Sequence, residues 1–569
     1  MRKLLILLAL CLGLPSFAGE PAVLRIPADR LGKPVLAGSR IVAVNRSRGK
    51  VFAPGQLNPF PRMARLQADS TGVSLLYEPS GKKGKQVPLL PARFPLAGEV
   101  TDGYLPVDAS AYFLAYPLPL SAIPPKMLEK DGLVSGRILK SVQTSDFITV
   151  TGEFRFSSGL EVTACFYLLY LPETPMPVRR VDPSKAGYNG EARSFRWDFS
   201  RRGRVDFYVD KAFPADWYPY IKEGIEDWNK AFEAIGLGPV LAVHPAPEDL
   251  DTSSPLVNMV RLMDVDEANA KGDVLTDPRS GEILQADILW WRNALDLMKG
   301  WRYVQTGAAD PQARLEDYPM EILGPMIRYS ICHEMGHSLG LSHNMGASWA
   351  YPSDSLRSVS FTQRYGTAAS VMDYARFNHL ATAADVAAGV SLLPPRLGPY
   401  DYYAIALGYG PDASLAAGEY CYYAPFISAA ISPDPSAQAE TLGNDLLASS
   451  RAGLRNCRAL LGLDGLTEKR LELVKKQYYR YIWLLLSNIG GTVEGQPVRG
   501  KVQRETLRCV FENLADVPPE LKDEALERRI LEELDGNFLP ERVRATGGKR
   551  ALKCYQTRLA RLRKKYGFV

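Results

Sequence analysis

The chain has 569 residues, of which 46 % are hydrophobic and 23 % are charged, and its formal net charge is +5. This length and apolar content are sufficient for two or three packed domains, and no low-complexity tract indicates extensive disorder. A charge this close to neutral in a chain of this size implies no nucleic-acid partner.

Residues 1–18 have the pattern of a secretory signal peptide. Arg2 and Lys3 precede a short apolar run, 4–14, and the segment ends with small residues at Ala18. We expect cleavage after Ala18, which lowers the charge from +5 to +3, and export to the periplasm or the outside of a bacterial cell. A lipid anchor on Cys11 is disfavoured, because the residue before it is large. No later stretch approaches about 20 uninterrupted apolar residues, so no transmembrane segment is predicted.

The remaining chain divides into three parts and is predicted to belong to the α+β class. Residues 19–200 contain short alternating segments broken by Gly, Pro, Asn and Asp, which predict a β-rich domain. Residues 201–410 mix strand and helix patterns, and residues 411–569 carry helical apolar spacing. Three roles stay open for the β-rich part: a pro-segment, a substrate-binding module or a packing domain.

Within the mixed part, apolar residues recur at spacings of four and three between Trp217 and Gly236, which predicts one amphipathic helix. The segment Ile283–Trp291 is predicted as a strand at a sheet edge, where an extended peptide could add, or as a strand that only packs internally. Further strands are predicted at 205–209, 240–243, 259–263 and 273–275. Further helices are predicted at 293–304, 398–408, 446–461, 468–486, 504–514, 525–534 and 550–566.

The segment from His333 to His343 has the form H-E-x-x-H-x-x-G-x-x-H and contains three of the five histidines in the chain. His333 and His337 are four residues apart, so on a helix both imidazoles point from one face toward a single Zn²⁺ ion. The third ligand, His343, requires the chain to turn after the helix, and Gly340 can adopt the positive φ of such a turn. Glu334 flanks the metal and is the candidate general base. The helix is expected to begin near Pro325.

A second motif, S-V-M-D-Y, places Met372 29 residues after His343. A methionine in a tight turn supplies a soft apolar floor beneath the three histidines. Tyr374, two residues later, can direct its phenol toward the metal or an oxyanion.

Two further features of the sequence are a polar segment that could cover the site and a set of cysteines that could form disulfides. The polar segment 179–188 is a candidate for lying over the cleft, with Asp182 as a possible latch. Six cysteines follow the signal peptide, an even number that makes disulfides possible in an exported protein. They are Cys165, Cys332, Cys421, Cys457, Cys509 and Cys554.

The histidine motif together with Met372 resembles the metzincin clan of zinc endopeptidases. The turn around Tyr374 is similar to that of astacins and serralysins, which implies a role for Tyr374 as a zinc or transition-state ligand. The segments 217–236, 276–288, 340–345 and 372–378 resemble bacterial exported metzincin-like proteases. These have a β-rich N-terminal domain and a helical C-terminal region, and the likeness covers roughly 145–460. It implies a catalytic domain with a twisted mixed sheet, a zinc helix and a Met-turn.

The sequence therefore predicts a zinc-dependent endopeptidase that acts on a protein or peptide substrate through a metal-bound water. One alternative is a zinc-containing binding or adhesion protein. Another is a zinc amidohydrolase that acts on a non-protein amide. The sequence gives no oligomeric state and no cleavage preference.

Overall fold

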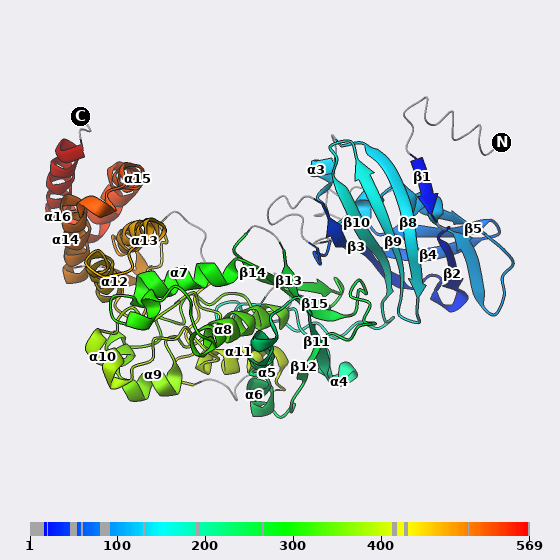
Figure 1. Cartoon of the computed structure of the whole chain (residues 1–569), viewed down its shortest axis with the longest axis horizontal. Helices are drawn as coiled ribbons and strands as arrows, with labels where there is room; N and C mark the ends of the chain where they lie inside the picture. The colour runs from blue at the N-terminus through cyan, green and yellow to red at the C-terminus, as the bar shows by residue number, and fades with distance from the viewer. Residues whose placement is uncertain are drawn as a thin grey trace. The chain divides into compact units, whose positions relative to one another are not determined.

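The protein has a mixed α+β architecture, with a β-rich N-terminal region and a helical C-terminal region (Figure 1), as predicted. The computed structural model describes residues 16–19, 21–45, 54–58, 61–79, 91–128, 131–188, 194–264, 267–411, 418–425, 431–494, 496–498 and 500–566. Most of the predicted signal peptide lies outside these ranges. No helix within them is both long and apolar enough to cross a membrane.

The described chain forms two compact units that are interleaved in sequence. The first contains residues 1–179, 195–213 and 243–294. The second contains residues 180–194, 214–242 and 295–569. The division of the chain at residues 200 and 410 stays a prediction.

In the first unit, eight of the described strands form one sheet in the order β1-β8-β9-β10-β3-β4-β5-β6. The strands of the N-terminal region are β1 (Ser16–Gly19), β2 (Val23–Pro27), β3 (Pro34–Val44), β4 (Arg62–Asp69), β5 (Gly72–Tyr77), β6 (Ala92–Pro95), β7 (Tyr104–Asp108), β8 (Leu133–Gln143), β9 (Phe147–Phe156) and β10 (Glu161–Tyr170). Two short helices, α2 (Ser110–Leu114) and α3 (Pro125–Leu128), lie between β7 and β8. In β2 every second residue is buried, including Leu24 and Ile26. This alternation is what puts one face of a strand into a core.

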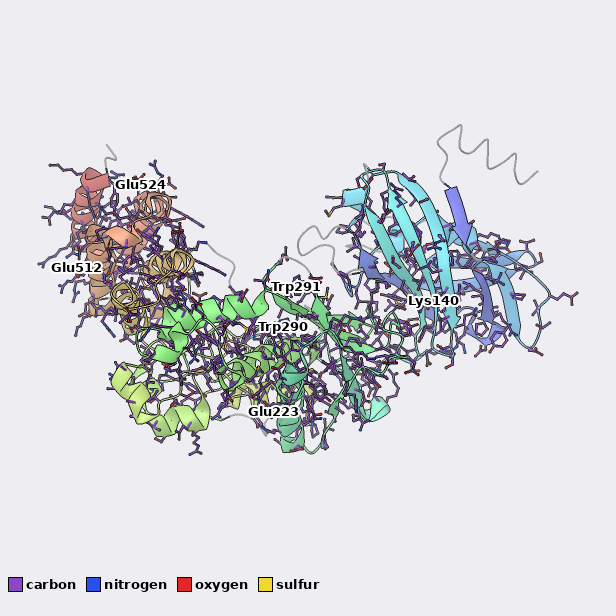
Figure 2. All side chains as sticks on the ribbon, viewed as in Figure 1. Lys140, Glu223, Trp290, Trp291, Glu512 and Glu524 are labelled. Carbon is purple, nitrogen blue, oxygen red and sulfur yellow. The ribbon has the colours of Figure 1, made fainter. Side chains whose placement is uncertain are left out.

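A second sheet, which lies in the first unit apart from the first two residues of β12, has the order β12-β11-β13-β15-β14 among the described strands. Its strands are β11 (Val205–Val209), β12 (Leu241–Pro245), β13 (Asn258–Met263), β14 (Ala270–Thr276) and β15 (Ile283–Trp291). β15 pairs in parallel with β13 and antiparallel with β14, so the prediction that Ile283–Trp291 forms the sheet edge is wrong. β14 is the edge strand instead. Every residue of β15 is buried, down to Trp290 and Trp291 at its end (Figure 2), as in a strand covered on both faces.

The two sheets of the first unit share a core. One apolar cluster combines Leu36 of β3 and Leu169 of β10 with Leu275 and Leu284 of the second sheet. Because this cluster is made jointly, removal of the N-terminal strands would expose the apolar surface of β14 and β15. This sharing favours the packing domain among the three roles considered for the β-rich part.

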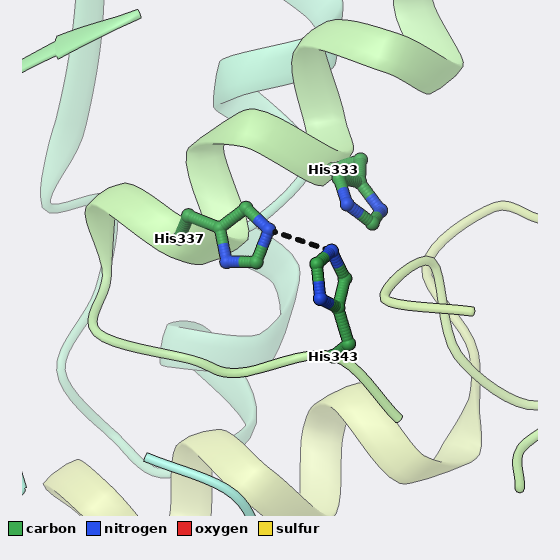
Figure 3. Close-up of side chains that lie close together, drawn as sticks. All are labelled: His333, His337 and His343. Carbon is green, nitrogen blue, oxygen red and sulfur yellow. Dashed lines mark hydrogen bonds between the residues drawn. The ribbon is translucent and has the colours of Figure 1, made fainter. Parts of the chain in front are cut away.

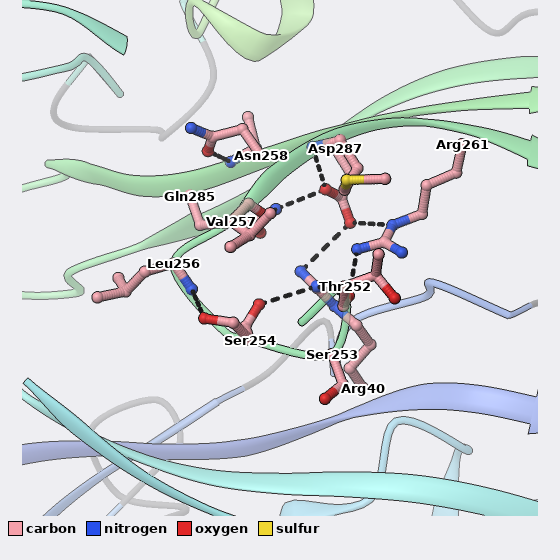
Figure 4. A network of polar contacts seen from close by, with 12 residues as sticks. Arg40, Thr252, Ser253, Ser254, Leu256, Val257, Asn258, Arg261, Gln285 and Asp287 are labelled. Atoms are coloured by element: carbon pink, nitrogen blue, oxygen red, sulfur yellow. Dashed lines mark hydrogen bonds and ion pairs between the residues drawn. The ribbon is translucent and has the colours of Figure 1, made fainter. Parts of the chain in front are cut away.

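A buried ionic network lies beside this shared core (Figure 4). Arg40 of β3 lies 3.2 Å from Asp287 of β15, and both side chains are almost fully buried. Arg261 of β13 donates to the same carboxylate over 2.9 Å. Arg40 also donates to the carbonyl oxygens of Thr252 and Ser254, at 3.2 and 3.0 Å. One carboxylate thus holds two guanidinium groups that come from different sheets.

The second unit is mainly helical. Its helices, with the first residue of α7 in the other unit, are α5 (Tyr218–Glu226), α6 (Asn229–Ala234), α7 (Ala294–Thr306), α8 (Met320–Ser338), α9 (Val359–Tyr365), α10 (Ala383–Ala388), α11 (Pro399–Tyr409), α12 (Leu446–Leu460), α13 (Glu468–Ser487), α14 (Gly500–Ala515), α15 (Glu524–Asp535) and α16 (Phe538–Tyr566). Most of the predicted helices agree with these bounds to within a few residues.

Two helix predictions need correction. The segment 217–236 forms two helices, α5 and α6, instead of one. Between them the N–H of Lys230 donates to the carbonyl oxygen of Asp227, only three residues earlier, and this tightens the chain. The helix that carries His333 and His337, α8, begins at Met320 with Pro325 inside it. Pro325 has no N–H to donate to the carbonyl oxygen of Glu321, four residues earlier. Glu321 is exposed, so water can donate to this oxygen instead. α16 is interrupted at Gly548, whose backbone is not helical, and its second part agrees with the helix predicted at 550–566.

The basic end of α16 has a structural use. The ammonium of Lys565 donates to the carbonyl oxygens of Leu514 and Ala515 at the end of α14, where helical carbonyls lack partners. The six cysteines in the described part of the chain are free, so none of the possible disulfides is formed among them.

Candidate metal centre

Three histidine side chains converge at the end of α8, in the second unit (Figure 3). His333 and His337 lie on the last two turns of the helix. The chain then turns at Gly340, whose φ is 91°, a value that suits glycine and few other residues. This turn brings His343 back, so that its Nε2 lies 3.2 Å from the Nε2 of His337.

The donor set fits a zinc ion. One ligand atom from each of the three histidines lies within 4.8 Å of the others. Two nitrogens bound to one tetrahedral zinc at about 2.0–2.1 Å are about 3.3 Å apart. The distance between His337 and His343 is close to this value. The Nε2 of His333 is buried and has no hydrogen-bond partner among the described residues, as expected for a nitrogen that serves as a metal ligand.

Backbone carbonyls select the tautomer of the two helical histidines. The Nδ1 of His333 lies 2.7 Å from the carbonyl oxygen of Val371, and the Nδ1 of His337 lies 2.8 Å from that of Leu341. A carbonyl only accepts, so each Nδ1 carries the proton and each Nε2 keeps its lone pair for a metal. Burial lowers the pKa of His333 well below its usual value and that of His343 to about 3, with the neighbouring His337 as the next cause. Both imidazoles are therefore neutral near pH 7.

Glu334 directly follows the first histidine on α8 and is 7 % exposed. Burial, followed by the charge of Glu334, raises the pKa of the Tyr374 phenol, so this carboxylate acts electrostatically on the second motif. The phenol of Tyr374 is therefore protonated near neutral pH.

Met372 and Tyr374 both reach the histidine cluster. Met372 is fully buried, and a Cβ at Gly336 would meet its sulfur at 2.3 Å, so the methionine packs directly under the turn between His333 and His337. The ring of Tyr374 is 4.5 Å from that of His343 and 5.3 Å from that of His333, measured between centroids. The residues singled out in the sequence therefore come together at one place.

Asp401, at the start of α11, orders the Met-turn and was not identified from the sequence. Its carboxylate accepts from the hydroxyl of Ser370 at 2.6 Å and from the N–H of Val371 at 2.9 Å. Since Val371 also accepts from His333, Asp401 fixes the turn that orients the first histidine. A signal was present, because Gly398-Pro399 followed by an acid at the third helical position is typical of a helix start.

Asp401 gives the fold a predicted dependence on pH. Burial raises its pKa to about 7, so the folded protein binds a proton that the unfolded chain releases near pH 4. The free energy of unfolding should fall as the pH rises from about 4 to 7. Denaturant unfolding across this range should give a weaker fall in the Asp401→Asn variant, in which the site cannot ionise. An equal fall in both proteins would contradict the assignment.

Asp182, in the polar segment 179–188, is not positioned to act as a latch. The Asp182 carboxylate is exposed and accepts from the N–H and the hydroxyl of Ser184, which closes a local turn. The end of the segment pairs with the chain just before the third histidine, since Tyr188 forms a bridge with Leu341 and Gly187 accepts from the N–H of Ser342 at 3.1 Å. Its contribution is to brace the turn that carries His343.

Comparison with known proteins supports the geometry. Residues 315–561 match a family model described as Met-zincin. The match begins later than the expected likeness over 145–460 and extends further, through the C-terminal helices into α16. No curated protein and no solved structure matches the chain. The matched family and the cluster of His333, His337 and His343, which fits the H-E-x-x-H zinc motif, together confirm the resemblance to the metzincin clan and identify residues 315–561 as a Met-zincin segment.

Proposed function

We propose that the protein is a zinc-dependent endopeptidase. The observation that carries this proposal is the convergence of three histidines on one point, with Glu334 next to the first of them on α8. Among the described residues the cluster offers three protein ligands, as in catalytic zinc sites, whereas structural sites use four. A zinc ion bound there lowers the pKa of a water and polarises the scissile carbonyl.

Three kinds of side chain have roles in this reaction. His333, His337 and His343 would hold the ion, with the tautomers of His333 and His337 set by the carbonyl oxygens of Val371 and Leu341. Glu334 takes a proton from the attacking water and later passes it to the leaving amine. Tyr374 is neutral at pH 7 and donates its phenolic proton in a hydrogen bond to the oxygen of the scissile carbonyl as negative charge develops there.

The two alternatives differ from this proposal in their substrates. A binding or adhesion protein would hold its ligand uncut and would need neither Glu334 nor an open coordination position. A zinc amidohydrolase would use the same groups on a non-protein amide, such as the cross-link of peptidoglycan.

A side-by-side assay separates the three functions. Zinc-loaded protein is incubated with a peptide library and with purified peptidoglycan, each with and without a chelator, and the products are identified by mass spectrometry. The proposal expects internal cleavage of peptides that stops on chelation. Chelator-sensitive release from peptidoglycan alone would favour the amidohydrolase, and binding without cleavage would favour the adhesion protein.

We further propose that the protein is exported and acts in the bacterial envelope or outside the cell. The support is the signal-peptide pattern of residues 1–18. N-terminal sequencing of the protein isolated from an expressing bacterium should begin at Gly19. A sequence that begins at Met1 would contradict export by this signal.

A further inference from the structure

Arg376 lies next to the candidate metal centre in an unusual environment. Its guanidinium carbon is 3.5 Å from the centroid of the Trp301 ring and 4.3 Å from that of the Tyr374 ring. Trp301 belongs to α7, and the Tyr374 ring in turn contacts His343 at 4.5 Å. A continuous row of contacts, from Trp301 through Arg376 and Tyr374, thus runs from α7 to the third histidine.

The backbone at Arg376 is strained. Its φ is 64°, in the left-handed region that non-glycine residues rarely adopt, and where Asn and Asp are tolerated best. The next residue is tied to α7 as well, because the N–H of Phe377 donates to the side chain of Gln305 at 2.9 Å. Trp301 and Gln305 of α7 therefore contact both Arg376 and the residue after it, and Tyr329 of α8 also interacts with the Arg376 side chain.

The charge of Arg376 has no carboxylate partner within 4.0 Å among the described residues, and its Nε is buried without a hydrogen bond. Aromatic faces are the groups that stabilise such a cation in place of an ion pair. The hydroxyl of Tyr374 also lacks a hydrogen bond within the described ranges, so contacts with the faces of the ring must determine where it points.

We infer that Arg376 is a positioning residue: clamped by Trp301, its guanidinium holds the ring of Tyr374 beside His343, where the phenol meets the substrate carbonyl. The contact between the phenol and the substrate carbonyl rests on the proposed function. The position of the Tyr374 ring beside His343 does not.

The first test is therefore structural and uses the metal-free protein. Arg376→Asn keeps a residue suited to the left-handed backbone but is too short to stack. Crystals of this variant should show the Tyr374 ring moved out of contact with His343, with the three histidines unmoved. Trp301→Leu, which removes the other side of the clamp, should give the same movement. A Tyr374 ring that keeps its place in both variants would overturn the inference.

The second test is kinetic. If Arg376 acts through Tyr374, Arg376→Asn should lower kcat about tenfold or more with little change in KM, since a lost oxyanion donor costs about 10²–10³-fold. In a Tyr374→Phe background the same change should have no further effect on kcat. Equal losses in both backgrounds would show a general structural effect and would contradict the inference.

Arg364 provides a matched control. It stacks on Tyr365 at 5.0 Å but is exposed and is not among the residues that contact the histidines. Arg364→Asn should leave kcat and the Tyr374 ring unchanged, and a loss equal to that of Arg376→Asn would count against a specific role. If the wild type cleaves no peptide, the proposed function is wrong, and the ring position in the metal-free crystals still decides the role of Arg376.

Discussion

Replacement of Glu334 by glutamine is expected to lower the rate of peptide hydrolysis by orders of magnitude while the protein still binds one zinc ion per chain. Glutamine keeps the size of the side chain but cannot take a proton from water. General bases contribute about 10²–10⁴-fold to a rate, so kcat should fall by a factor in this range. The three histidine ligands and their carbonyl partners are untouched, so metal content measured by atomic absorption should equal that of the wild type.

Glu321 offers a matched control on the same helix. It lies in the first turn of α8, is exposed and is about three turns before His333, so Glu321→Gln should leave kcat within about twofold. Full activity in Glu334→Gln would refute the role of the carboxylate. Loss of zinc from this variant would show that Glu334 supports the metal site rather than the proton transfer.

The second large effect is expected at Asp287. Its carboxylate is buried between the guanidinium groups of Arg40 and Arg261. In Asp287→Ala two cations would face each other without a counter-charge, in a place where burial already lowers the pKa of Arg40. Loss of one partner of a buried ion pair costs about 3–5 kcal/mol, and the first unit should become less stable by about this amount. The measurement is urea unfolding of the full chain, followed by a probe in the first unit.

A surface ion pair in the first unit provides a control for the loss of stability expected in Asp287→Ala. Arg137 and Glu153 lie 2.5 Å apart, with about half of each side chain exposed. Glu153→Ala should therefore cost no more than about 1 kcal/mol. If Asp287→Ala costs no more than this control, the network does not hold the two sheets together. In that case the argument against a removable N-terminal segment rests on the shared apolar cluster alone.

Local patterns in the sequence predicted much of this structure. Apolar spacing placed α7, α11 and the helices after residue 446 to within a few residues, because each buries one face and its periodicity is a local property. The histidine motif also carries its geometry locally, since a helix fixes the spacing of His333 and His337 and a glycine fixes the turn to His343.

Features that depend on distant pairing could not be predicted in this way. β15 is flanked by β13 and by β14, and nothing in an apolar run tells an inner strand from an edge strand. The same is true of Asp401 and Arg376, whose roles depend on contacts with residues from other elements. The start of α8 was predicted too late because proline is common at helix starts. α8 begins earlier because Glu321, whose carbonyl has no N–H partner at Pro325, is exposed to water.

The central claim is that a single zinc ion, held by His333, His337 and His343, makes this protein a peptidase. The most direct test is the rate of peptide cleavage by metal-free protein as zinc is added in known amounts. The rate should rise from zero in proportion to zinc and level off at one ion per chain, and it should stay at zero in His337→Ala. Cleavage by the metal-free protein, or no cleavage at one zinc per chain, would contradict the claim.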